Sequence, residues 1–298
     1  MQKVLSEGII MKISLNIRNA NELEPPLQQA MGDIEAKYEI SLPTAISFDY
    51  DSLAWLHSAK IGDLENLSRV EIASWTDASV PKRIGRLGEL ARRDSVTPSE
   101  RAEYRELLLE IYALLPINVG SLVADNETLV VAPRREGYLL ALGMGWLPPG
   151  RGLSPNVKRF KQSGRLVVGL DLVVPERSFR NCVLVDGAIA SGVSLIAVMA
   201  TLARQVDRFI VVSAHAASAG VNALRHAAAA VGRPLIVYVG EISGELNDSF
   251  YAVVPGTSPP LVVVGDLGDM IAGPAKNMAA PSSKQVAQSQ DPCDDPSG

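Results

Sequence analysis

Cysteine and histidine, the residues from which disulfide frameworks and many metal sites are built, are scarce in this chain of 298 residues. Cys182 and Cys293 are its two cysteines, and its three histidines are scattered without metal-ligand spacing. We therefore expect no disulfide framework and no metal held by protein groups alone. Cys182 precedes an apolar segment, so we expect it to be a small, buried core residue.

Long apolar runs and an excess of positive charge are also missing. Apolar stretches such as Phe209–Val212 are far shorter than the roughly 20 residues that cross a bilayer, and the N-terminus lacks the apolar region of a secretory signal. The formal net charge is −5, and the 28 basic residues are dispersed rather than gathered into a stripe. These features argue against a membrane span and against general nucleic-acid binding, and we expect a cytoplasmic protein.

The chain does have enough apolar residues to bury a large core, because 47% of its residues are hydrophobic and 20% are charged. Residues 274–298 are rich in Pro, Ser, Ala, Gln and Asp, which predicts a disordered tail. Residues 1–77 are mixed, with an alternating run at Met11–Ile17, and predict an N-terminal α+β accessory region. The main domain is expected to span residues 78–273.

Two helices are predicted at the start of this main domain. Arg83–Arg92 has the pattern of a short helix. Thr97 is a good N-cap, and Pro98 inside the first turn predicts a second helix that runs to about Leu115. Apolar residues recur at helical spacing along this second segment and supply a face that can pack on a sheet.

Beyond these helices, strand-like and helical segments alternate. Five runs are rich in Val, Leu and Ile without polar alternation: Thr128–Ala132, Leu166–Leu170, Cys182–Val185, Phe209–Ser213 and Leu235–Val239. Such runs are typical of strands buried on both faces of a parallel sheet, with Ser194–Gln205 and Ala219–Ala230 as crossover helices. The pattern predicts a doubly wound α/β fold, in which ligands bind beyond the carboxyl ends of the strands.

The segment Val183–Leu195 combines the features of a phosphate site. A buried strand ends at Asp186, a turn of small residues follows, and a helix is expected to begin near Ser194. Small residues let backbone N–H groups approach an anion, and the helix N-terminus adds the positive end of its dipole. Asp186 can accept two hydrogen bonds from vicinal sugar hydroxyls. The same pattern is also that of an ordinary strand, loop and serine-capped helix.

This segment resembles the phosphoribosyl-pyrophosphate motif of type I phosphoribosyltransferases. It is similar to the uracil phosphoribosyltransferase version, in which one acid is followed by A-T-G-G-S. The resemblance implies that Asp186 holds the ribose hydroxyls. It also implies that five consecutive residues cradle the 5-phosphate: Ala190, Ser191, Gly192, Val193 and Ser194.

Two upstream segments are similar to the same family. Leu90–Thr97 resembles the family's L-x-x-R-D-x-x-T segment, so Arg93 matches an arginine that contacts pyrophosphate. Pro133–Gly137 resembles the start of the family's pyrophosphate loop, P-x-L-R-A-G-L-G-M, and Arg135 matches its arginine. The resemblance therefore implies catalytic roles for both arginines and for Asp186, with Mg²⁺ bound through the pyrophosphate of the substrate.

The C-terminal part of the main domain resembles the family's base-recognition stretch, L-N-E-x-G-Y-I-V-P-G-L-G-D-A-G-D. The similar segments are Glu245–Asp248, Val254–Gly256 and Gly265–Asp269. By this resemblance, the residues that bind the acceptor base are Tyr251, Gly256, Gly265, Asp266 and Leu267. The resemblances follow one another in the family's chain order over about residues 78–273, which a chance match does not explain.

The chain departs from the family pattern at three places. Val193 stands where the family has a glycine, which matters if that position requires a positive φ angle. Glu136 places a negative charge beside Arg135. Thr257–Val264 is an insertion in the base-recognition stretch, and its apolar half, Leu261–Val264, has the composition of a strand.

The resemblance as a whole implies a pentosyltransferase that moves a 5-phosphoribosyl group from phosphoribosyl pyrophosphate to uracil or a related base, releases pyrophosphate and forms a homodimer. Two alternatives stay open because of the departures. One is transfer to a non-pyrimidine acceptor in specialised metabolism. The other is a non-catalytic module that senses phosphoribosyl pyrophosphate or a nucleotide. In all three readings the partners are small molecules, not nucleic acid or membrane.

Overall fold

The computed structural model describes residues 9–15, 68–93, 95–162, 165–247, 251–254, 257–259 and 261–272. Its centre is a seven-stranded sheet in the order β2-β10-β9-β7-β3-β4, with β8 paired to β9, and every described pairing in it is parallel. The strands are β2 (Ser68–Ile72), β3 (Thr128–Val131), β4 (Gly152–Leu153), β7 (Phe179–Val185), β8 (Ala188–Ile189), β9 (Val206–Ala216) and β10 (Leu235–Ile242).

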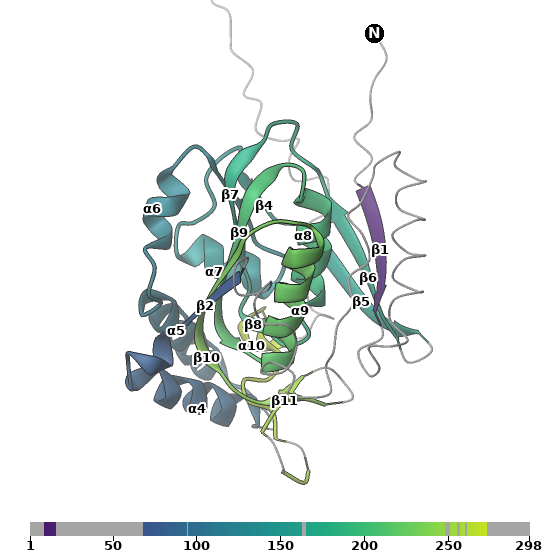
Figure 1. Ribbon diagram of the computed structural model, residues 1–298. Coiled ribbons are helices and arrows are strands. Elements are labelled where there is room, and N and C mark those ends of the chain that lie inside the picture. Colours follow the sequence, from purple (N-terminus) through teal and green to yellow (C-terminus); the bar gives the residue numbers. More distant parts are fainter. Residues whose placement is uncertain are drawn as a thin grey trace, which may run out of the picture.

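Helices cover both faces of this sheet (Figure 1). One face carries α8 (Val193–Leu202) and α9 (Ser218–Ala230). The other carries α4 (Ser79–Ala91), α5 (Pro98–Ala113), α6 (Val119–Ala124), α7 (Glu136–Gly143) and α10 (Leu267–Ala272).

Strand β7 illustrates how the two faces of the sheet contact different helices. Cys182 and Leu184 belong to the core on the α8 and α9 side, whereas Val183 and Val185 belong to the core on the α5 and α7 side. All four side chains are 0% exposed, so the strand is apolar throughout because both its faces are covered. The predicted doubly wound α/β fold with a mostly parallel sheet is confirmed, as is the buried position of Cys182.

One predicted strand lies in a different sheet. The apolar run Leu166–Leu170 falls within β6 (Arg165–Leu172), which pairs antiparallel with β1 (Ile9–Leu15) and β5 (Asn156–Gln162). Placing this run in the parallel sheet was therefore wrong. Leu170, at the end of this run, and Leu172, further along β6, are buried in the core that α8 covers, and β6 packs against that helix. Figure 1 shows the three strands as a separate layer beside α8.

The predicted helices agree with the structure. The short helix before Thr97 is α4, and Thr97 caps α5 through a reciprocal pair of bonds with Glu100. The predicted division at residue 77 stays a prediction, and β2, which precedes it, forms an edge of the central sheet. The tail, residues 274–298, lies outside the described residues. Among the helices that the structure describes, none is long and apolar enough to cross a membrane.

The capping box of α5 gives a first test of this local structure. Thr97→Ala removes the acceptor for the Glu100 backbone N–H and the donor to the Glu100 carboxylate, and we expect it to lower the free energy of unfolding by about 1 kcal/mol. Urea denaturation measures the change. Ser95→Ala, at an exposed neighbouring position, serves as the control, and an equal effect in both variants would contradict a capping role for Thr97.

Candidate functional site

The turn after β7 begins at Asp186 and holds most of the predicted phosphate-binding residues. The Asp186 backbone N–H donates to Val212 O at 3.1 Å, which ties the end of β7 to the neighbouring strand β9. The Asp186 carbonyl accepts from the Tyr112 hydroxyl of α5 at 2.5 Å. Both bonds fix the backbone of Asp186, so its carboxylate leaves the sheet from a well-defined point.

The backbone of this turn is pressed against the first turn of α9. A Cβ added to Gly220 of α9 would lie 2.3 Å from Ala190 O, so only a glycine permits this approach. Gly192, the N-cap of α8, has φ 72°, and α8 starts at Val193 without a side-chain cap from the described residues. The turn therefore presents the N-terminal end of α8 with its positive dipole, as an anion site requires.

Val193, which stands where the family has a glycine, does not have a strained backbone conformation. The positive φ falls on Gly192, whereas Val193 is the first residue of α8 and its side chain is 1% exposed in the core. Ser191 is also buried, and its Oγ accepts from the Val193 backbone N–H at 3.5 Å. Ser194 is half-buried, so it is the more accessible of the two hydroxyls in the turn.

Arg135 stands out by its backbone. It is the N-cap of α7 with φ 79° and ψ −115°, and it is the one non-glycine residue with a positive φ in the part of the chain that the structure describes. Such a conformation costs on the order of 1–3 kcal/mol and is found mainly where a side chain must be aimed for a function. The strained backbone supports the choice of Arg135 as a site residue.

The Arg135 guanidinium lies against the start of α10. It forms an ion pair with Asp269, and its Nη2 is 3.6 Å from the Asp266 carboxylate. Gly268 makes room for it, since a Cβ there would lie 2.4 Å from Arg135 Cζ. The charge that the pyrophosphate loop was expected to supply is thus shared with two carboxylates of the C-terminal segment.

The segment after β10 forms an antiparallel arm. Strands β11 (Glu245–Leu246) and β12 (Ala252–Val253) pair, and the chain then returns along β12 with Val262 opposite Val253. Val254 N donates to Leu261 O at 2.8 Å, and Val263 N donates to Ala252 O at 2.9 Å. The apolar half of the insertion is therefore paired with β12 through an isolated bridge at Val262, whereas its composition had indicated a strand.

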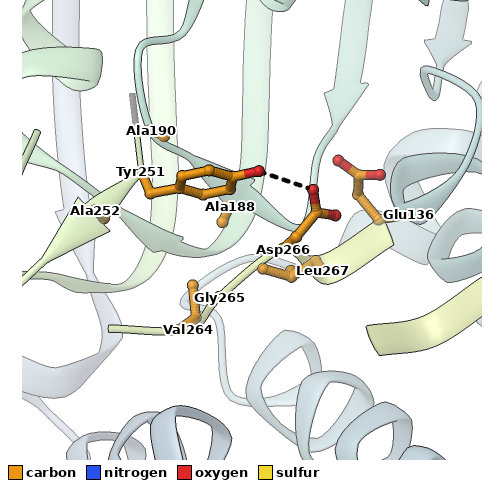
Figure 2. Close-up of a pocket in the computed structure, with 9 residues that line it drawn as sticks. All are labelled: Glu136, Ala188, Ala190, Tyr251, Ala252, Val264, Gly265, Asp266 and Leu267. Carbon is orange, nitrogen blue, oxygen red and sulfur yellow. Dashed lines mark hydrogen bonds between the residues drawn. The ribbon is translucent and has the colours of Figure 1, made fainter. Parts of the chain in front are cut away.

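The three segments meet at one small cavity, which has a volume of about 50 Å³ (Figure 2). It is lined by Glu136 next to Arg135, by Ala188 and Ala190 of the turn after β7, and by residues of the arm and the start of α10: Tyr251, Ala252, Val264, Gly265, Asp266 and Leu267. Figure 2 shows the Tyr251 hydroxyl pointing at Asp266, to which it donates at 3.2 Å, with Glu136 on the far side of that carboxylate.

The structure therefore brings together residues that are far apart in the sequence. Four predicted acceptor-base residues line the cavity with Ala190 of the phosphate turn: Tyr251, Gly265, Asp266 and Leu267. The fifth, Gly256, lies outside the described residues. Arg93 pairs with Glu100 at the start of α5 and is 44% exposed, and none of its described contacts reaches the cavity.

Asp266 has three roles in this arrangement. Its Oδ1 accepts from the Asp269 backbone N–H at 3.0 Å and so caps α10, and its Oδ2 accepts from Tyr251. It also lies within reach of Arg135. The structure shows that it caps a helix and lines the cavity at the same time.

Two buried tyrosines were missed by the sequence analysis. Tyr104 and Tyr112 lie on α5, and burial, followed by the charges of nearby carboxylates, raises both pKa values. Those carboxylates are Asp266 and Glu136 for Tyr104, and Asp186 and Glu136 for Tyr112. The three acids are thus close enough to act on the same pair of phenols. The only sequence signal was the spacing of the tyrosines on an apolar helix face.

The acids around the cavity outnumber the cations near it. Among the described residues, the acids are Glu136, Asp186, Asp266 and Asp269, and the nearby cations are Arg135 and Arg101, so a polyanionic ligand would need to bind together with a cation. Within the described ranges, no three acidic, His or Cys side chains lie close enough to hold a metal ion by themselves. When Mg²⁺ is bound mainly by the phosphates of a substrate, the protein typically contributes one or two carboxylates.

Comparisons with known proteins found similarity in solved structures alone. No family model and no curated protein matches the chain. The AQ2163 protein from Aquifex aeolicus is 19% identical, with a TM-score of 0.44, over 64% of this chain and 94% of that one. Adenine phosphoribosyltransferase from Trypanosoma brucei, solved with AMP, pyrophosphate and ribose-5-phosphate, is 13% identical, with a TM-score of 0.36, over 55% of this chain and 81% of its own.

A third similar structure is the xanthine-guanine-hypoxanthine phosphoribosyltransferase of Helicobacter pylori. It is 17% identical, with a TM-score of 0.34, over 46% of this chain and 87% of that one. Several structural neighbours are thus phosphoribosyltransferases.

The buried His215 behind the phosphate turn generates a pH prediction. It lies on β9 opposite Ala188, is 0% exposed, and its Nε2 is 3.0 Å from Ser243 Oγ. Burial lowers its pKa from 6.5 to about 4, against a smaller raising effect of a Ser243 backbone bond. The unfolded chain therefore takes up the proton first as the pH falls. The stability due to neutral His215 is complete above pH 6.5 and is lost on approach to pH 4.

We expect a loss of about 2 kcal/mol in the free energy of unfolding attributable to His215 between neutral pH and pH 5. Urea denaturation at both pH values measures it. His215→Gln removes the titrating group and keeps a polar side chain of similar size, so its loss over the same interval is expected to be smaller by that amount. An identical pH slope in the two proteins would contradict a buried, neutral His215.

Proposed function

We propose that this protein is a phosphoribosyltransferase that transfers the 5-phosphoribosyl group of phosphoribosyl pyrophosphate to a small nucleobase-like acceptor. The observation that carries the proposal is that three segments meet around one cavity: the turn after β7, the start of α7 next to Arg135, and the arm with the start of α10. The turn was singled out from its small residues and the helix that follows it, and the other two segments from their resemblance to one family. Their convergence at the carboxyl ends of parallel strands is what a ligand site in this fold requires.

In this proposal the turn after β7 holds the sugar-phosphate end of the substrate. The 5-phosphate lies at the N-terminus of α8, where Ala190–Ser194 supply backbone N–H groups and the Ser194 hydroxyl. The Asp186 carboxylate accepts hydrogen bonds from the ribose hydroxyls. Arg135 turns from Asp269 to the departing pyrophosphate, and Arg93, which pairs with Glu100 in this structure, is proposed to join it there.

The reaction needs positioning more than covalent chemistry. The bond between C1 of the ribose and pyrophosphate breaks, a bond from an acceptor nitrogen to C1 forms, and the proton of that nitrogen leaves to solvent. The protein holds the two reactants in line and stabilises the departing negative charge. The arm supplies the acceptor side, with Tyr251, Gly265, Asp266 and Leu267 around the base, and we place Gly256 there by the same resemblance.

Magnesium fits the residues at this site. The charges of Asp186 and Glu136 both act on the Tyr112 phenol, so two carboxylates lie near the place proposed for pyrophosphate. They would hold Mg²⁺ together with the phosphate oxygens of the substrate. Bound there, the ion would neutralise charge that develops on the leaving group. Glu136, a departure from the family pattern, thereby has a use at the site.

Uracil is one acceptor class among several. The inserted segment contributes Val264 to the wall of the cavity, which supports an acceptor of different shape. The ion pair of Arg135 with Asp269 favours a second candidate function, a module that binds the sugar phosphate without turnover. Both candidates use the same phosphate turn, so one assay distinguishes them.

That assay follows pyrophosphate release from phosphoribosyl pyrophosphate with Mg²⁺ in the presence of uracil, adenine, hypoxanthine and further heterocycles. We expect turnover with one acceptor class and at least a hundredfold loss of activity in Arg135→Ala, since removal of one charge-stabilising donor costs about 10²–10³ in rate. Binding of phosphoribosyl pyrophosphate without turnover would identify the sensing module, and no binding at all would refute both.

Asp186→Asn tests the sugar end separately. The change keeps the size of the side chain but removes the negative charge that accepts from two hydroxyls, and we expect affinity for phosphoribosyl pyrophosphate to fall at least tenfold. Isothermal titration calorimetry measures it. Asp207→Asn, an exposed acid at the opposite end of β9, is the matched control, and wild-type affinity in Asp186→Asn would count against the assignment.

Asp269→Asn is expected to act in the opposite direction. Asp269 competes with pyrophosphate for Arg135, and the pair is partly exposed, so its removal has a modest effect. We predict a two- to fivefold gain in affinity for inorganic pyrophosphate with Mg²⁺. The double variant with Arg135→Ala should lose the gain, and a gain that persists there would show that Asp269 acts through general charge alone.

A further inference from the structure

We infer that helix α5 is a positioning element for catalysis, and that Tyr112 sets the sugar-phosphate half of the site while Tyr104 sets the acceptor half. The inference rests on the proposed function for the identity of the ligands. The two hydrogen bonds from tyrosine hydroxyls to backbone carbonyls, on which the inference depends, are present whichever ligands bind. Neither tyrosine lines the cavity: Tyr104 acts through the backbone of Val264, which lines it, and Tyr112 through the backbone of Asp186, two residues before the lining residue Ala188.

Tyr112 holds the point where the sugar-phosphate turn begins. Its hydroxyl donates to the carbonyl of Asp186 at 2.5 Å, across 74 positions of sequence. The tyrosine is 2% exposed, and its ring packs edge-on against Trp146 with ring centroids 5.6 Å apart. Two residues beyond Asp186, the same turn contributes Ala188 to the cavity wall.

Tyr104 holds the acceptor segment in the same manner. Its hydroxyl donates to the carbonyl of Val264 at 2.5 Å, across 160 positions of sequence, and the side chain is 0% exposed. Val264 and the three residues after it line the cavity. A shift of this carbonyl therefore moves Gly265 and Asp266 directly.

The two bonds come from one rigid body. Tyr104 and Tyr112 are separated by two turns of α5, and Arg101, one turn before Tyr104, donates to the carbonyls of Asp269 and Met270 in α10. One helix thus fixes both sides of the cavity relative to each other. A reaction between two bound molecules depends on that distance, since small displacements of reacting groups cost large factors in rate.

The hydrogen bonds from Tyr104 and Tyr112 also persist at neutral pH. Burial, with the nearby carboxylates, raises both phenol pKa values well above the ordinary value of 10.0, so each hydroxyl keeps the proton that it donates. Each accepting carbonyl is at the edge of the site, and an unpaired carbonyl there would shift to find another donor or water.

Tyr112→Phe and Tyr104→Phe test the inference, because each keeps the ring that packs in the core and removes only the hydroxyl. For Tyr112→Phe we expect roughly tenfold weaker binding of ribose 5-phosphate by calorimetry, with the KM for the acceptor unchanged. For Tyr104→Phe we expect ribose 5-phosphate binding within twofold of wild type and a roughly tenfold higher KM for whichever nucleobase supports pyrophosphate release. Tyr138→Phe, at a surface position of α7, is the control.

Hydrogen–deuterium exchange of the intact protein without ligand separates the two claims. Tyr112→Phe should speed exchange in the peptide that spans residues 186–194 and Tyr104→Phe in the one that spans 261–272, each without affecting the other. If the wild type binds no ribose 5-phosphate and releases no pyrophosphate, the proposed function fails while this split in exchange still decides the role of α5. Parallel changes in both regions, or in neither, would overturn the inference, as would equal loss of both affinities in each variant.

Discussion

The site depends on how closely neighbouring backbones approach the end of strand β7. The turn after this strand lies between the first turn of α9 and the N-terminus of α7, and at both contacts a side chain would collide with a carbonyl oxygen. A Cβ on Gly220 would be 2.3 Å from Ala190 O, and a Cβ on Gly137 would be 2.5 Å from Val185 O. Contact at this distance, together with the Tyr112 bond to the Asp186 carbonyl, fixes the turn in front of the N-terminus of α8.

The electrostatic balance of the site follows from the same compactness. Segments that end at one edge of the sheet bring Asp186, Glu136, Asp266 and Asp269 close to a single strained arginine. An excess of negative charge at a proposed anion site would repel the anion unless a divalent cation binds with it. With one, the carboxylates become part of the recognition, and the arginine is held ready by partners weaker than a phosphate.

The sequence predicted the main architecture because its signals were local. Apolar runs such as Cys182–Val185 reflect burial on both faces of a strand, and Thr97 with Glu100 specifies a helix start within four residues. The run Leu166–Leu170 was assigned to the wrong sheet. Apolar composition indicates that a strand is covered, but it does not indicate which element covers it. Its partner strand, β1, lies more than 150 residues away in the chain.

The site was predictable only in part for a related reason. Asp186, Arg135, Tyr251 and Asp266 could be named because they stand in recognisable patterns, yet nothing local shows that Asp269 pairs with Arg135 or that the strained φ falls on an arginine. The two tyrosines of α5 look like ordinary core residues in sequence. Their hydroxyls matter through carbonyls 74 and 160 positions away, and such partners become visible only when the chain is folded.

The antiparallel arm after β10 has a consequence for how this protein could diversify. Its two sides are held together by their own backbone bonds between Ala252–Val254 and Leu261–Val263, and the connection between these two segments is its outer end. Residues can be added or lost at that end without disturbing the parallel strands or the turn that follows β7. One wall of the pocket is therefore free to be remodelled over evolutionary time, while the opposite wall keeps its shape.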